Sequence, residues 1–171
     1  MATSDRVPLW MISVLFVFNT VLVVLFQMRL VRRITSHADA ADGWRRAGLL
    51  FFLGCALMAG VSFDAPVAVP LAIVVVLVAA MLHTFGELRH GSGQFSLALG
   101  LADSSQMGRY QGLFNLGEGV AGCLAPPFVG YLCTGAGPWG WLGIGVALVL
   151  AGLTARPAVR AAERTRAVQP S

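Results

Sequence analysis

Polar side chains recur at helical spacing in a stretch of the chain that is otherwise apolar. Residues 81–94 read MLHTFGELRHGSGQ and directly follow the run VAVPLAIVVVLVAA. On a helix, His83, Glu87, His90 and Gln94 fall within about 60° of one another, because residues three or four apart share a face. The spacing therefore predicts one helix face that carries a carboxylate, two imidazoles and an amide.

Glu87 gives the sharpest chemical prediction of this stretch. Ionisable residues inside membrane spans are costly and normally face a bundle interior or a water-filled path. A carboxyl group in such a low-dielectric site can take up and release protons near neutral pH. We therefore expect Glu87 to couple protons or to contact a substrate. The alternative is a structural carboxylate tied to Arg89, to His83 or to a neighbouring helix.

The remaining polar residues allow two interpretations each. The two histidines either line the same cavity or sit at a helix interface, and Gln94 continues their face. Arg89 falls on roughly the opposite face, where pairing with a carboxylate on another helix competes with substrate binding. Gly86 and Gly93 share the face of Arg89, and small residues there predict the close approach of a neighbouring helix.

We expect neither a metal, nor another cofactor, nor an enzyme. Glu87 and His90 form one Glu-x-x-His motif, but di-iron bundles need two copies and further carboxylates. Haem on His83 or His90 is a less favoured alternative. Haem bound across a helical bundle normally needs a partner histidine on a facing helix, and the other histidine, His37, lies in a predicted loop. The three cysteines are isolated and fit small buried hydrophobes. The sequence shows no nucleophile–base pair and no phosphate-binding loop.

The composition places these residues in a membrane protein. Of the 171 residues, 57% are hydrophobic and 12% charged, whereas a soluble domain carries about 25% charged residues. The mean hydropathy is +0.75. All 12 basic residues are arginines. They cluster beside apolar segments, which favours a role in membrane topology over binding to nucleic acid.

Five segments are long and apolar enough to span a bilayer, which takes about 20 residues of helix. The expected spans are 9–28, 46–63, 67–100, 110–133 and 138–155. They predict an all-α, polytopic membrane bundle over residues 1–156. A basic tail, 157–171, is expected to follow as a frayed helix or coil.

The arginines alternate between the connecting loops. The loop 29–46 has five arginines, the loop after the third span has Arg109, and the C-terminal segment that starts at Arg156 has four, whereas the other two connections have none. By the positive-inside rule, these basic segments lie in the cytoplasm. We therefore expect a multi-pass protein of the inner (plasma) membrane, with its N-terminus outside and its C-terminus cytoplasmic.

The first span carries two amides, Asn19 and Gln27. They are candidates for lining the same cavity as Glu87, or for hydrogen bonds between helices.

The fourth span is rich in glycine and contains a pair of prolines. Gly112 and Gly119 predict close packing of this helix on a neighbour. Pro126 and Pro127 predict a kink, because proline removes a backbone hydrogen bond and clashes with the preceding turn.

The segment GELRHGSGQFSLALGLADSSQMGRYQGLFNLGEGVAGCLAPPFVGYL resembles the major facilitator superfamily, in particular its bacterial drug-efflux-type members. The matches are Gly86-Glu87 in what looks like the tenth helix, MGRYQG at 107–112, and the helix that ends PPFVGYL. The first span, FNTVLVVLFQMRLVRR, looks like the eighth helix of the family. The resemblance covers about residues 9–156.

The resemblance implies a partial facilitator fold, helices eight to twelve of the family's twelve, with substrate bound between two six-helix halves. It implies a transporter, as part of a complete permease, that exports small molecules, and Glu87 adds proton coupling, as in an antiporter. The expected partners are the bilayer, a small-molecule substrate, and the N-terminal half or another chain, but not nucleic acid. The alternative is a self-standing five-helix protein that acts as a structural or regulatory subunit.

Overall fold

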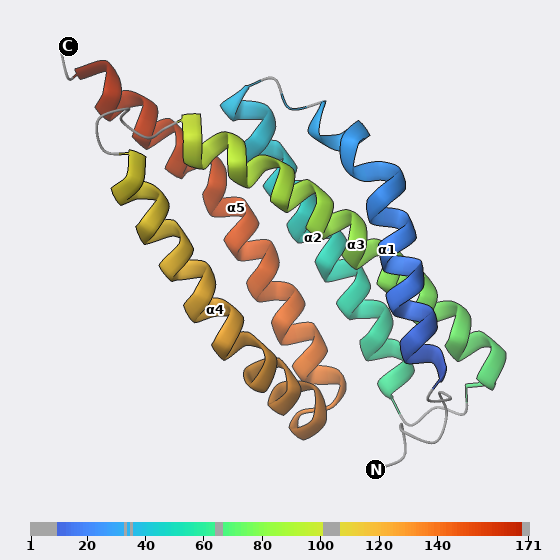
Figure 1. Cartoon of the computed structure of the whole chain (residues 1–171). Helices are drawn as coiled ribbons and strands as arrows, with labels where there is room; N and C mark the ends of the chain where they lie inside the picture. Colours follow the sequence, from blue (N-terminus) through green and yellow to red (C-terminus); the bar gives the residue numbers. More distant parts are fainter. Residues whose placement is uncertain (1–9, 33, 35, 64–66, 101–106, 169–171) are drawn as a thin grey trace.

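The described part of the chain is a bundle of five α-helices without strands (Figure 1). A computed structural model describes residues 10–32, 34, 36–63, 67–100 and 107–168. The helices are α1 (Trp10–Val31), α2 (His37–Ser62), α3 (Val69–Gly100), α4 (Met107–Gly135) and α5 (Pro138–Val168). Each is long and apolar enough to cross a membrane. The predicted all-α bundle is therefore confirmed, and the five apolar helices indicate a multi-pass membrane protein.

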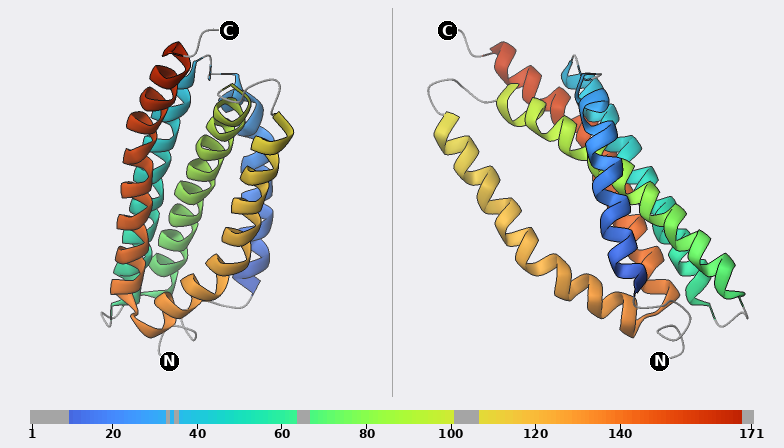
Figure 2. Two further views of the ribbon diagram at one scale, coloured as in Figure 1. Left: turned by 90° about the vertical axis from the view of Figure 1, so that its left-hand side faces the viewer. Right: turned by 45° about the vertical axis from the view of Figure 1, so that its right-hand side comes forward.

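Helix α2 is the centre of the bundle. It packs along α3 on one side and along α5 on the other, whereas α1 packs chiefly on α3. Helix α4 lies at the edge and has few contacts with α5 and α3 (Figures 1 and 2). We call the end where α1, α3 and α5 finish and α2 and α4 begin the basic end, because Arg29, Arg109 and Arg156 lie there.

Small residues let α2 approach its neighbours closely, as they do at many helix interfaces in membranes. Its buried residues are Ala40, Ala41, Ala47, Gly48, Gly54, Cys55 and Ala59. A Cβ atom placed on Gly48 would lie 2.8 Å from the carbonyl oxygen of Leu148 on α5. One placed on Gly152 would lie 2.9 Å from the carbonyl oxygen of Trp44. The backbones of α2 and α5 therefore meet almost directly.

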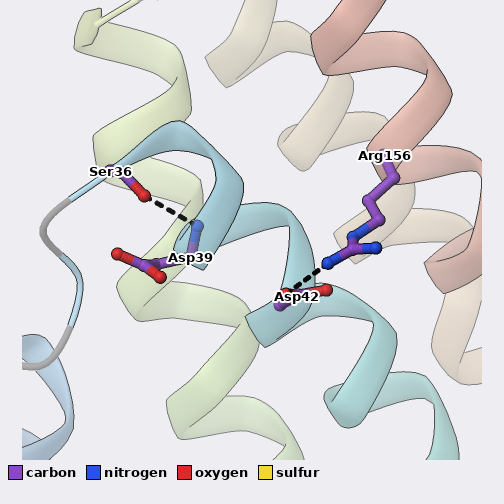
Figure 3. A network of polar contacts seen from close by, with 4 residues as sticks. All are labelled: Ser36, Asp39, Asp42 and Arg156. Atoms are coloured by element: carbon purple, nitrogen blue, oxygen red, sulfur yellow. Dashed lines mark hydrogen bonds and ion pairs between the residues drawn. The ribbon is translucent and has the colours of Figure 1, made fainter.

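Helix α2 begins at His37, earlier than the predicted start at residue 46. The residue before it, Ser36, is an N-cap in an extended conformation, and its Oγ accepts a hydrogen bond of 3.1 Å from the backbone N–H of Asp39 (Figure 3). Such a cap satisfies one of the unpaired N–H groups at a helix start. The expected loop 29–46 is therefore helical at both ends.

The tail, expected as a frayed helix or coil, also differs from its prediction. Helix α5 continues without a break through Pro157 to Val168. The buried residues Ala155 and Val159 pack against Ala41, with Trp44 packed against the cluster. Alanine, arginine and glutamate, which dominate this stretch, are also strong helix formers. The extensions of α2 and α5 thus stabilise each other beyond the predicted spans.

Helix α4 keeps Pro126 and Pro127 inside one continuous helix. Its ribbon bends in the C-terminal half, where the two prolines lie (Figure 2). None of its residues, all of which the structure describes, is buried. A Cβ atom on Gly112 or Gly119 would meet no atom within 4 Å. The close packing expected through these glycines is therefore not made with the described helices, because α4 lies at the bundle edge.

Candidate functional site

Glu87 lies exposed in the middle of α3, where it lines two neighbouring cavities beside α1. Glu87 and Gln27 line a cavity of about 380 Å³. Glu87 also lines a cavity of about 270 Å³, together with Asn19 and His83. We call the surface formed by these four residues the α1–α3 groove. It unites four of the polar residues that the sequence singled out, two from each helix.

A hydrogen bond inside the groove joins its two helices. The hydroxyl of Thr84, only 2% exposed, donates to Asn19 Oδ1 over 2.6 Å and lies 2.9 Å from the carbonyl oxygen of Ala80. Asn19 therefore both lines the groove and ties α1 to α3. Thr84 was not a predicted site residue. The signal for it was present, since hydroxyl residues in spans commonly bond across helices.

His83 is held between the groove and α2. Its Nδ1 lies 3.1 Å from the carbonyl oxygen of Ala79, and its Nε2 lies 3.9 Å from Cys55 Sγ. The imidazole also packs against the ring of Phe51, with 5.5 Å between the centroids. Both interpretations of this histidine therefore apply, because one edge lines the groove while the ring fills a helix interface.

His90 turns towards α2 and is absent from the groove lining. Its ring stacks on Trp44, with centroids 4.7 Å apart and an interplanar angle of 22°. The indole Nε1 of Trp44 also donates to the carbonyl oxygen of His90 over 3.0 Å. Trp44 was overlooked among the arginines of the predicted loop. The sequence signal for Trp44 was its residue type, because the amphipathic ring of tryptophan suits the membrane–water interface.

Gln94 faces α4 rather than α1. Its Nε2 donates to Oε1 of Glu118 in the middle of α4. Gln111 and Asn115 precede Glu118 at helical spacing, with 3.4 Å between Gln111 Nε2 and Asn115 Oδ1. Helix α4 therefore carries a second polar stripe, formed by Gln111, Asn115 and Glu118, and Gln94 connects it to α3.

Two glycines of α3 also pack on α2, against the same aromatic residues that His83 and His90 contact. A Cβ atom on Gly86 would lie 2.8 Å from the ring of Phe51. One on Gly93 would lie 3.0 Å from both the carbonyl oxygen of Ala40 and the indole of Trp44. Arg89 points into a separate cavity at the basic end, away from the α1–α3 groove.

Two ion pairs brace the basic end. Arg156 Nη2 on α5 lies 2.6 Å from Asp42 Oδ2 on α2 (Figure 3). His37 Nδ1 lies 3.5 Å from Glu163 Oε1, a contact that is an ion pair when the imidazole is protonated. Both pairs join the extensions of α2 and α5, so they reinforce the packing of Ala41 against Ala155.

Among the described residues, no group of three or more His, Cys, Asp or Glu side chains is arranged to hold a metal ion. None of the family models, curated proteins or solved structures with which the chain was compared matches it. The functional feature that the structure shows is a groove between two apolar helices, lined by a carboxylate, two amides and an imidazole.

Proposed function

We propose that the chain is a helical part of a facilitator-type permease that exports small molecules in exchange for protons, with Glu87 as the proton-exchanging residue. The observation that carries this proposal is the position of Glu87. It is an exposed carboxylate in the middle of an apolar span, and it lines both cavities of the α1–α3 groove. Carboxylates are rare in spans and mark proton and substrate paths.

The groove supplies the complementary chemistry for such an exchange. A protonated carboxyl group in an apolar groove is neutral. After it releases the proton, the carboxylate anion attracts either another proton or a group of the substrate. The amides of Asn19 and Gln27, on the facing helix, offer both donors and acceptors to a small molecule. Proton release and substrate binding would then compete for one site, which is the basis of exchange.

The stripe of α4 supports the presence of further helices around this bundle. Gln111, Asn115 and Glu118 belong to a helix without a buried residue. Polar residues in spans normally face a bundle interior or a water-filled path rather than lipid. Additional helices, from another part of the permease or from another chain, would cover this stripe and complete a cavity.

The test is energised efflux. Cells that produce the chain together with its native neighbouring sequences are loaded with a panel of fluorescent small molecules, and efflux is followed while the external pH is varied. We expect Glu87→Gln to reduce proton-driven efflux to background, because an amide cannot exchange a proton. Glu163→Gln is the matched control, since it makes the same chemical change outside the groove. Unchanged pH dependence in Glu87→Gln would remove this residue from the mechanism.

The stripe of α4 also favours a second candidate, a self-assembling structural subunit in which another copy covers α4. Cys123 is exposed on this helix and can report such an assembly. Oxidative crosslinking in membranes, with Cys123→Ser as the control, measures it directly. A Cys123-linked dimer without efflux of any test compound would support the subunit and contradict the permease.

A further inference from the structure

A cavity of about 370 Å³ lies at the basic end, between the end of α1, the start of α2 and the second half of α3. Three arginines line it, one from each helix: Arg29, Arg46 and Arg89. Its apolar side includes Phe26 and Phe85, whose rings meet edge to face with centroids 5.2 Å apart. The guanidinium of Arg29 lies 5.7 Å from the centroid of the Phe26 ring. The cavity is therefore cationic and apolar at once.

The two carboxylates in the same cavity do not cancel its positive charge. Asp42 is paired with Arg156, which reaches it from α5 outside the cavity lining (Figure 3). Asp39 lies in the first turn of α2, where a carboxylate complements the positive end of the helix dipole. The lining arginines together with Arg156 outnumber these two carboxylates, so the cavity attracts anions.

The cavity lies at the depth of lipid headgroups. Helix α1 has 22 residues, a length of about 33 Å, which matches the roughly 30 Å of bilayer hydrocarbon. Arg29 lies in the last turn of this helix. Phe26 and Phe85, which precede Arg29 and Arg89 by about one helical turn, add apolar surface on the hydrocarbon side.

We propose that this cavity binds the phosphate headgroup of an anionic lipid. Arginine recognises phosphate oxygens through paired N–H donors. Here Arg29, Arg46 and Arg89 surround the phosphate, while Phe26 and Phe85 contact the glycerol and the first methylenes of the acyl chains. The apolar part of the lining favours a lipid over soluble phosphate, which shares only the charged group. This assignment is independent of the proposed transport function.

The ligand is tested on the purified full chain in a neutral detergent at low salt. Thermal unfolding is followed with added phosphatidylglycerol, phosphatidylcholine or inorganic phosphate. We expect phosphatidylglycerol to raise the unfolding temperature by roughly 5 °C, since a ligand that binds only the folded state stabilises it. The other two additives should have little effect. Equal stabilisation by inorganic phosphate, or by phosphatidylcholine, would overturn the lipid assignment.

The site is tested with the double variant Arg29→Gln/Arg46→Gln, because both side chains are exposed. It should lose most of the shift caused by phosphatidylglycerol. Arg160→Gln is the matched control: it is exposed on α5 near the same end and does not line the cavity. A full shift in the double variant, or an equal loss in the control, would overturn the site. Native mass spectrometry of the wild-type protein measures lipid selectivity independently of any variant, and the absence of preferential phosphatidylglycerol retention would also overturn it.

Discussion

Helices α2 and α4 are both rich in small residues, yet they differ completely in packing. Alanine and glycine of α2 are buried against α3 and α5 along most of its length. Helix α4 has more glycines, and none of its residues is buried. Small residues thus permit the close approach of helices without causing it. What α2 has and α4 lacks in the described bundle is a complementary helix on each side.

The largest expected difference between the two helices comes from the same substitution made in each. Gly48→Ala puts a methyl group 2.8 Å from the carbonyl oxygen of Leu148, and such overpacking costs about 1–3 kcal/mol of unfolding free energy. Gly112→Ala enters open space on α4 and should stabilise the helix by up to about 1 kcal/mol.

Detergent-denaturation curves of both variants under one condition measure these changes. Equal destabilisation of the two variants would show that α4 is as tightly packed as α2, which would contradict the difference between these helices. If Gly112→Ala is harmless in the isolated chain but impairs efflux by the proposed permease, α4 packs on a helix from outside the described bundle, and its difference from α2 becomes more specific.

A smaller effect is expected where the extensions of α2 and α5 meet. Arg156→Gln removes the 2.6 Å contact with Asp42, whose side chain is 29% exposed. Partly exposed ion pairs contribute about 0.5–1 kcal/mol, and salt weakens them. Thermal unfolding at low and high salt should show this loss mainly at low salt. Arg164→Gln, an exposed change on the same helix, is the control. If Asp42→Asn and Arg156→Gln prove strictly additive in the double variant, the pair does not contribute.

The smallest effect concerns the contact of α1 with α3. Thr84→Val keeps the side-chain shape but removes the hydroxyl that donates to Asn19. Hydrogen bonds between membrane helices average about 0.6 kcal/mol, so the unfolding free energy should fall by about that amount. Thr20→Val is the matched control, because Thr20 is exposed and bonds only within its own helix, to Phe16. An equal effect of both changes would mean that α1 does not depend on this bond.

The spans could be predicted from the sequence because hydropathy and length are local properties of the chain. The starts and ends that extend beyond the apolar windows could not be predicted in that way. Residues 37–45 and 157–168 are polar and carry several charges, so they resemble loops when each is considered alone. Their helical state depends on packing against each other. The pattern Ser36-x-x-Asp39 was the one local signal for the earlier start of α2.

The candidate site shows the same division between local and tertiary information. Helical spacing placed His83, Glu87, His90 and Gln94 near one another, since only the geometry of one helix was needed. Which neighbour each side chain meets depends on the positions of the other helices. Glu87 thus faces the groove beside α1, while His90 stacks on α2 and Gln94 bonds to α4.

The paired ends of α2 and α5 form a rigid attachment point for a second domain. Helix α5 has 31 residues and is about 46 Å long, more than the roughly 30 Å of hydrocarbon that a span must cross. Its last turns run beside the first turns of α2 and are braced there by the pairs Asp42–Arg156 and His37–Glu163. A marker domain joined to α5 in continuous helical register would therefore keep a fixed orientation to the bundle. That rigidity would give electron microscopy a visible reference for aligning single particles.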